Sequence, residues 1–168
     1  MGYLLSNLST GVFFNDNTKL IQDDHKNYYY YERQGADKYD TLIKFNDPPL
    51  KVEKKVLIHQ RFARYIIGDN EISLSGDPSD KQVYVKKWVK TPHAIMFKLS
   101  NHTVQVIFKD QTEILLSTDS KLVTFKNKAN SRVTYTMKRA LELETQVGRR
   151  DEEIGEFLKR LKYTRDLI

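Results

Sequence analysis

Short runs of apolar and aromatic residues, interrupted by Asn, Asp and Gly, fill the first 45 positions of the chain. This alternation is typical of antiparallel strands joined by tight turns, because Asn, Asp and Gly adopt turn geometry at little cost. It predicts strands at residues 3–6, 10–15, 18–22, 27–33 and 38–43. The run Tyr28–Tyr31 falls on the fourth strand. We expect two of its tyrosines to be packed and two half-exposed; a partner-facing aromatic strip is the alternative.

From residue 50 the apolar spacing changes to three and four residues, which predicts a helix over roughly 50–67. One apolar stripe of this helix consists of Val52, Val56, His59, Ala63 and Ile67. An adjoining stripe contains Ile58, Phe62 and Tyr65. Asp47, just before two prolines, is the expected N-cap.

A polar segment with Gly76, Asp77 and Pro78 follows and predicts a linker at 69–82. The strand pattern then resumes and predicts strands at 83–89, 93–99, 103–109, 112–117, 121–126 and 131–138. An extra helical turn is expected at 139–147, ended at Gly148, before a closing helix. The closing helix has apolar residues at helical spacing from Ile154 to Ile168, with acidic residues at its start and basic ones in its later turns.

The chain repeats itself at an offset of 94 residues. Residues 5–21 align with 99–115 over 17 positions without a gap, and 7 of these are identical. The identical positions include Leu5-Ser6-Asn7, Asp16 and Thr18, which return as Leu99-Ser100-Asn101, Asp110 and Thr112. One copy has too little sheet to bury both faces. We therefore expect an α+β fold in which two copies pack sheet against sheet.

Charge changes this picture little. The formal net charge of +6 is spread along the chain, with +2, +1, +2 and +1 in segments 1–68, 69–100, 101–137 and 138–168. The single local basic cluster, Lys86, Lys87 and Lys90, surrounds Trp88, and we interpret it as a solvated edge of the linker. Since a nucleic-acid binder gathers its charge on one face or tail, we expect no nucleic-acid partner. Without an apolar run of 18 residues, we expect no membrane span either.

Catalytic motifs are missing from the sequence. It contains no cysteine, no glycine-rich phosphate loop and no glycine-flanked serine nucleophile. The four histidines are scattered, without metal-ligand spacing between them. We therefore interpret the chain as a binding module that is not an enzyme and holds no cofactor or metal.

The repeat also carries a family signature. Gly2, Tyr3 and Leu5, followed by the run Gly11–Ile21, resemble the opening of the first polo box of polo-like kinases. A second set of residues resembles the opening of the family's second box: Trp88, Thr91, Ala94, Ile95, Leu99–Asn101, Val104–Val106 and Phe108. A third set resembles the family's closing helix: Leu158, Leu161, Tyr163 and Arg165. The similarity runs over essentially all 168 residues.

This resemblance implies a first polo box at 1–68, a linker at 69–82 and a second box at 83–168. Each box would be a six-stranded antiparallel sheet with a C-terminal helix, and the pair would pack as a β-sandwich. The chain would be the non-catalytic docking domain of a polo-like serine/threonine kinase that acts in the cell cycle. In the family, a groove between the boxes binds partner peptides that carry phosphoserine or phosphothreonine after a serine. Such docking targets the kinase to the centrosome or basal body, the kinetochore and the division site, in the cytoplasm, on the cytoskeleton and in the nucleus.

The family's phosphate-binding pair is altered here. Its second box has Asp-His-Thr-Lys, and this chain has Asp110-Gln111-Thr112-Glu113. Gln111 still offers a neutral donor, but Glu113 reverses a charge. A unit charge pair at about 4 Å is worth roughly 4 kcal/mol at an effective dielectric of 20, so replacing attraction by repulsion costs about twice that. We therefore predict weak or absent binding of the standard phosphopeptides.

The peptide-groove candidates are thus Gln111, Glu113, Lys109 and Trp88, with Lys126 and Lys128 as the next donors along the chain. In the family a groove tryptophan and a bracing segment precede Gly-Tyr-x-Leu; neither stands before Gly2 in this sequence, which leaves open whether the parent protein has them. A tyrosine-rich side pocket of the family matches Ile58, Arg61, Phe62, Tyr65 and Phe108; sandwich core is the alternative for these positions. An oligomerisation element, or an autoinhibitory element that contacts its own kinase domain, is the alternative function.

Overall fold

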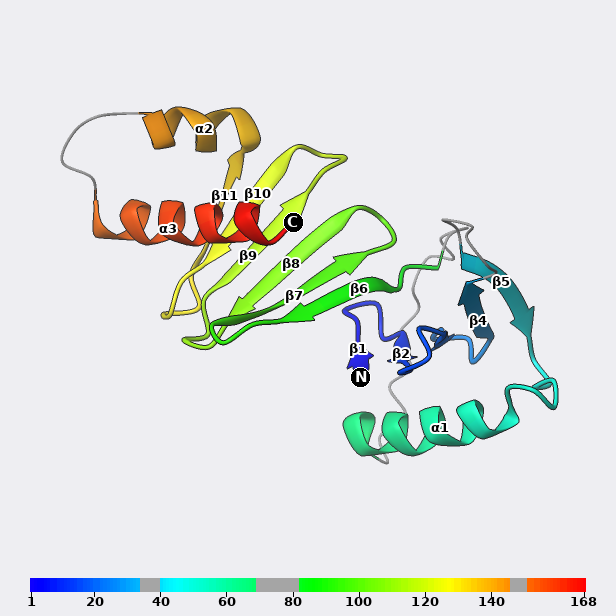
Figure 1. Cartoon of the computed structure of the whole chain (residues 1–168). Helices are drawn as coiled ribbons and strands as arrows, with labels where there is room; N and C mark the ends of the chain where they lie inside the picture. The colour runs from blue at the N-terminus through cyan, green and yellow to red at the C-terminus, as the bar shows by residue number, and fades with distance from the viewer. Residues whose placement is uncertain (34–39, 69–81, 146–150) are drawn as a thin grey trace. The chain divides into compact units, whose positions relative to one another are not determined.

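The computed structural model describes residues 1–33, 40–68, 82–145 and 151–168. It divides into two compact units, Met1–Tyr84 and Val85–Ile168, and each is described by itself (Figure 1). The predicted linker, apart from Gln82, and Gly148 lie outside the described residues.

The first unit contains a five-stranded antiparallel meander in the order β1-β2-β3-β4-β5. Its strands are β1 (Gly2–Leu4), β2 (Thr10–Phe13), β3 (Lys19–Gln22), β4 (Tyr28–Arg33) and β5 (Asp40–Phe45). The expectation of six strands in this box is therefore wrong for the described residues.

Helix α1 (Glu53–Ile67) packs on β1, β2 and β3. Val52 and Val56 are buried among Leu20, Tyr28 and Tyr30, which confirms the predicted apolar stripe. The predicted cap at Asp47 is wrong, because the helix starts only at Glu53 and its N-cap, Val52, makes no side-chain cap bond.

The second unit is a six-stranded antiparallel sheet in the order β11-β10-β9-β8-β7-β6. Its strands are β6 (Val85–Lys90), β7 (Ala94–Leu99), β8 (Thr103–Phe108), β9 (Glu113–Ser117), β10 (Leu122–Lys126) and β11 (Arg132–Thr136). The last strand is shorter than predicted, because Met137 already begins helix α2 (Met137–Thr145).

Helices α2 and α3 (Glu152–Leu167) cover one face of this sheet (Figure 1). Buried residues alternate with more exposed ones along β8, β9 and β10, as expected when one face carries the helices. Phe125 and Phe157 are almost fully buried in this core and their rings lie 5.9 Å apart. Asp151 caps α3 by accepting a bond from the Glu153 amide.

Candidate functional site

The tight turn between β8 and β9 holds the residues that match the family's phosphate-binding pattern. Asp110 closes it, since its Oδ1 accepts bonds from the Thr112 hydroxyl at 2.8 Å and the Thr112 amide at 3.3 Å. Phe108 N–H donates to the Thr112 carbonyl at 2.9 Å, and Gln111 N–H donates to the Phe108 carbonyl at 3.0 Å. Gln111 is exposed at the tip with a φ of 70°, in the left-handed region. The turn therefore presents the Gln111 side chain to solvent.

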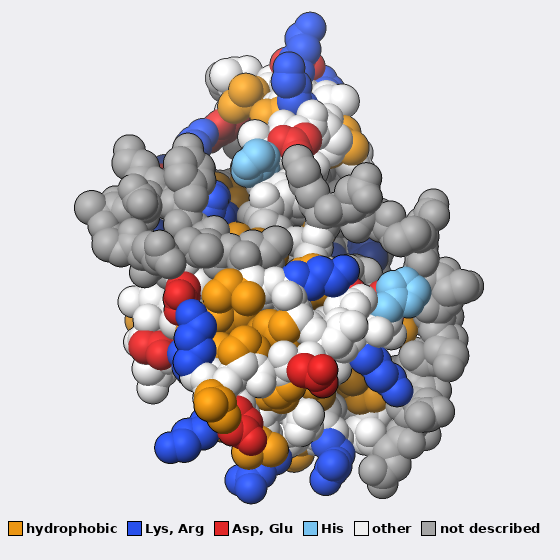
Figure 2. Space-filling view, turned by 90° about the vertical axis from the view of Figure 1, so that its right-hand side faces the viewer, with side chains coloured by type: hydrophobic (Ala, Val, Ile, Leu, Met, Phe, Trp, Pro, Cys, Tyr) orange, Lys and Arg blue, Asp and Glu red, His pale blue; other side chains and the backbone are white. Residues whose placement is uncertain are grey.

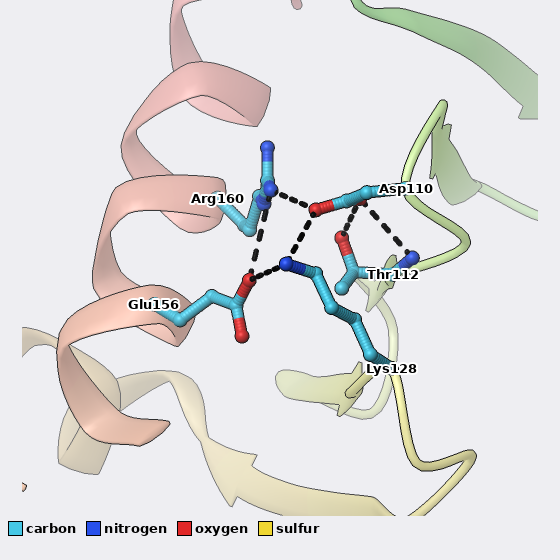
Figure 3. A network of polar contacts seen from close by, with 5 residues as sticks. All are labelled: Asp110, Thr112, Lys128, Glu156 and Arg160. Carbon is cyan, nitrogen blue, oxygen red and sulfur yellow. Dashed lines mark hydrogen bonds and ion pairs between the residues drawn. The ribbon is translucent and has the colours of Figure 1, made fainter. Parts of the chain in front are cut away.

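A charged network ties this turn to α3 (Figure 3). Arg160 Nη2 donates to Asp110 Oδ2, and Lys128 Nζ lies 3.6 Å from the same oxygen. Glu156 lies 3.7 Å from Arg160 and 3.8 Å from Lys128, so two carboxylates and two cations alternate. The Arg160 guanidinium also lies over the Phe108 ring, 4.5 Å from its centroid.

Asp110 is a stable anion in this network. Burial raises the pKa of its carboxyl, but the two Thr112 bonds and the charges of Arg160 and Lys128 outweigh burial and hold the pKa below its usual value. The negative charge next to Gln111 is therefore permanent at neutral pH and is compensated from α3.

Glu113 does not face solvent as a bare charge. It lies opposite Lys126 in the β9–β10 ladder, and Lys126 Nζ donates to its carboxylate at 2.6 Å. Both side chains are about one-fifth exposed. The negative charge of Glu113 is thus neutralised within the sheet. The same ion pair engages Lys126, which the sequence predicted as a donor to the phosphate.

The remaining groove candidates are less closely grouped. Lys109 is exposed, and in the described part of the chain its side chain makes no ion pair. Trp88 is half-buried on β6, the edge strand, where it pairs with Phe97 of β7; two strands separate β6 from β9. Lys128, the other predicted donor, is engaged by Asp110 and Glu156.

The side-pocket candidates fall into two groups. Ile58 and Tyr65 are 52% and 87% exposed on α1. Phe62 is half-buried over the backbone of Gly2, where an added Cβ would lie 2.1 Å from its ring. Phe108 instead belongs to the core of the second unit, at 5.6 Å from the Tyr163 ring and beneath Arg160.

Sequence inspection missed Arg160 and the role of Lys126. Lys126 pairs with Glu113 across two strands, which requires the strand register. Arg160 lies 50 residues beyond Asp110, on a helix whose basic residues suited its dipole equally well. The only signal was the repeated Asp-x-Thr, which marks a carboxylate fixed in a turn.

Clustered charge, metal-ligating side chains and long apolar helices are other features that mark functional surfaces. On the face shown in Figure 2, basic side chains lie among acidic and apolar ones and form no single patch. Among the residues that the structure describes, three or more metal-ligating side chains never cluster. No helix within the described ranges is long and apolar enough to cross a bilayer.

Comparison with known proteins agrees with the geometry. A family model described as POLO box duplicated region matches residues 1–56 and 91–148. The probable serine/threonine-protein kinase CCRP1 of Zea mays is 43% identical over 132 residues, which cover 74% of this chain and 21% of that protein. The serine/threonine-protein kinase PLK1 of Xenopus laevis is 28% identical over 179 residues, covering 100% of this chain and 28% of that protein.

Solved structures show the same fold. The polo-box domain of Cdc5 from budding yeast matches with a TM-score of 0.76 at 20% identity, covering 98% of this chain and 68% of that one. Its complex with an Spc72 phosphopeptide matches with a TM-score of 0.73 at 23% identity, covering 96% and 63%. The chain spans between 21% and 28% of the two kinases described above. With two matched segments in the two units, the chain belongs to the polo-box family, whose duplicated region is a non-catalytic binding domain.

Proposed function

We propose that this chain is the docking domain of a serine/threonine protein kinase of the cell cycle, and that it binds protein partners through the β8–β9 turn of its second box. Relatives named as serine/threonine kinases, one of them a cell cycle kinase of budding yeast, support this parentage. The Cdc5 polo-box domain has been solved with an Spc72 phosphopeptide and with the Dbf4 polo-interacting region, so partner segments are the expected ligands.

One observation carries the choice of site. Gln111 lies exposed at the tip of a turn that is closed by Asp110 and tied to α3 by Arg160. A polar side chain on a fixed turn meets a partner segment with little loss of conformational entropy. Its amide both donates and accepts, which suits a peptide backbone or a polar partner side chain.

Phosphate is a poor ligand for this site, which keeps the exposed Lys109 but lacks the family's His-x-Lys pair. A phosphate group carries nearly two negative charges and needs charge-assisted donors. Glu113 takes up Lys126, and Asp110 and Glu156 take up Arg160 and Lys128. We therefore propose that docking depends little on phosphorylation of the partner.

Self-association through the β6 edge is less favoured than docking. The edge strand β6 exposes Lys86, Lys87 and Lys90 and carries a register shift between Val85 and Lys87. Charge and bulges on an edge strand oppose pairing with a second copy. We expect a concentration-independent monomer in light scattering.

Targeting is tested by localisation in dividing cells. The chain fused to a fluorescent protein is expected to concentrate at the centrosome or basal body, or at the division site. Gln111→Ala is expected to reduce this enrichment at least twofold. Asn17→Ala alters the matching turn of the first box and is expected to leave it unchanged. A diffuse signal from the unaltered chain would contradict the docking function, and equal effects of the two variants would contradict the site.

A further inference from the structure

The turn between β8 and β9 occurs a second time, between β2 and β3 of the first unit. Asp16 Oδ1 accepts bonds from the Thr18 hydroxyl at 2.6 Å and the Thr18 amide at 3.1 Å, as Asp110 does from Thr112. Phe14 N–H donates to the Thr18 carbonyl at 2.9 Å, and Asn17 N–H donates to the Phe14 carbonyl at 3.1 Å. Asn17 has a φ of 64°, close to the 70° of Gln111. The two turns therefore share their hydrogen bonds and their left-handed residue.

A cation from a helix anchors each turn in the same way. Lys55 of α1 donates to Asp16 Oδ2 at 2.7 Å, as Arg160 of α3 does to Asp110 Oδ2. Lys55 Nζ lies 5.1 Å from the centroid of the Phe14 ring, and the Arg160 guanidinium lies 4.5 Å from that of Phe108. In both cases one carboxylate oxygen holds the turn and the other holds the helix.

The two cations are not aligned by the repeat. Lys55 follows Asp16 by 39 residues, whereas Arg160 follows Asp110 by 50. Two different residue types at different offsets thus make the same contacts with the aspartate and the phenylalanine. This recurrence distinguishes the contact from an incidental surface ion pair, which would be worth little.

Each anchored turn contains a residue in the left-handed region. A residue other than glycine in the left-handed region is unfavourable, and glutamine gains less from local bonding there than asparagine. The helix cation holds the aspartate that closes the turn, and so holds the left-handed residue that follows it.

We propose that Lys55 and Arg160 are the positioning residues of these two turns, and that Arg160 thereby sets the geometry and the charge of the docking turn. The second half of this inference rests on the proposed docking function. Without Arg160, Asp110 would present an uncompensated carboxylate beside Gln111, and the turn would open more often. An acidic partner segment would then be repelled as well as misplaced.

Amide hydrogen exchange measured by NMR tests the positioning role. Arg160→Gln is expected to raise the exchange rate of the Gln111 amide at least tenfold and to leave the Asn17 amide unchanged. Lys55→Gln is expected to raise the exchange rate of the Asn17 amide at least tenfold and to leave the Gln111 amide unchanged. Arg160→Lys and Lys55→Arg each keep a cation at the anchor and give it the residue type found in the other unit. In these variants the exchange rates of the Gln111 and Asn17 amides should stay within threefold of those in the unaltered chain. Amides of β3 and β9 report on stability and should not change.

Two results would overturn the positioning role. One is an unchanged Gln111 amide in Arg160→Gln. The other is an equal rise across the amides of β9, which would mean that Arg160 supports the fold in general and not the turn.

A titration separates this role from the docking function. In the double variant Gln111→His/Glu113→Lys, which restores the family's phosphate-binding pair, a Ser-phosphothreonine peptide is the probe. Adding Arg160→Gln should weaken its binding at least tenfold, and adding Lys55→Gln less than twofold. If the exchange results hold but the double variant does not bind, this turn is not the family's phosphate site, while the positioning role of Arg160 and Lys55 and the phosphate-independent docking function are unaffected. Equal losses from both added variants would refute the role of Arg160 in docking.

Discussion

Gln111 adopts a backbone conformation that glutamine seldom adopts, at the tip of the turn proposed to meet the partner. Histidine and asparagine are enriched in the left-handed region. The histidine that the family has at this position would therefore fit the turn, and it would also bind a phosphate. The sequence could predict the turn from Asp110 and Thr112, because an aspartate two residues before a threonine closes such a turn by side-chain bonds. It could not show that the Gln111 side chain is exposed.

The effect of Glu113 depends on its partner in the sheet. Its type indicated a repulsive charge, but its effect depends on Lys126, which is directly opposite in the ladder. Because the pair is neutral, a phosphate loses an attraction and does not meet a bare carboxylate. The expected loss of phosphopeptide binding free energy is therefore closer to about 4 kcal/mol than to twice that value.

Releasing Lys126 should restore part of the phosphate affinity. Glu113→Gln removes the carboxylate that holds Lys126 and is expected to strengthen the binding of a Ser-phosphothreonine peptide about tenfold, or about 1.4 kcal/mol. NMR shift titration measures this even at millimolar affinity. Lys126→Gln is the matched variant and should weaken binding. Equal affinities of the two variants would show that this pair does not face the peptide.

At the scale of elements, His59 links α1 to β2 and gives the first unit its pH dependence. It is fully buried, and its Nε2 lies 3.0 Å from the Thr10 hydroxyl. Burial lowers the pKa of His59, and a hydrogen bond with the Thr10 backbone offsets this only in part. The folded state therefore disfavours the protonated imidazole, while the unfolded chain binds a proton near pH 6.5.

Acid should destabilise the chain through this histidine. The stabilisation is fully present above pH 6.5 and is lost as the pH falls below it, by up to about 1.4 kcal/mol per pH unit until the folded pKa is reached. Urea unfolding is expected to show a lower free energy of unfolding at pH 5.5 than at pH 7.5, by at most about 1.4 kcal/mol. The free energy of unfolding of the variant His59→Gln should fall less between pH 7.5 and pH 5.5. If both chains respond equally, the pH dependence arises elsewhere.

Two glycines in different elements should respond in opposite ways to alanine. Gly155 lies within α3, and no other side chain comes within 4 Å of the place that an added Cβ would take, so Gly155→Ala should stabilise by about 1 kcal/mol. In β2, a Cβ on Gly11 would lie 2.2 Å from the buried Tyr3 ring, so Gly11→Ala should destabilise by about 1–3 kcal/mol. Thermal unfolding of both variants measures this. Destabilisation by Gly155→Ala would contradict the open helix face.

The sequence predicted the elements better than their ends. Strands at 103–109 and 112–117 correspond to β8 and β9, because the apolar alternation follows the buried face. The Asp47 cap failed because a turn closed by the Val52 amide and the Pro49 carbonyl separates the prolines from α1. The expectation for Tyr28–Tyr31 was also wrong in part: Tyr28, Tyr30 and Tyr31 are all buried.

At the scale of the whole molecule, the repeat is what the sequence predicted most firmly. The aligned positions Asp16 and Asp110 close the same turn in the two units. The anchoring cations could not be predicted, because the chain between turn and helix differs in length and only packing brings them together. The packing of one sheet on the other into a sandwich stays a prediction.

We propose that the charges around Gln111 and Glu113 decide whether docking by this domain depends on phosphorylation of the partner. Isothermal titration calorimetry of a Ser-phosphothreonine peptide against the unaltered chain and against Gln111→His/Glu113→Lys tests it most directly. The unaltered chain is expected to bind in the millimolar range, about 4 kcal/mol, and the double variant in the micromolar range, about 8 kcal/mol. Micromolar binding by the unaltered chain that is lost on dephosphorylation of the peptide would contradict the account.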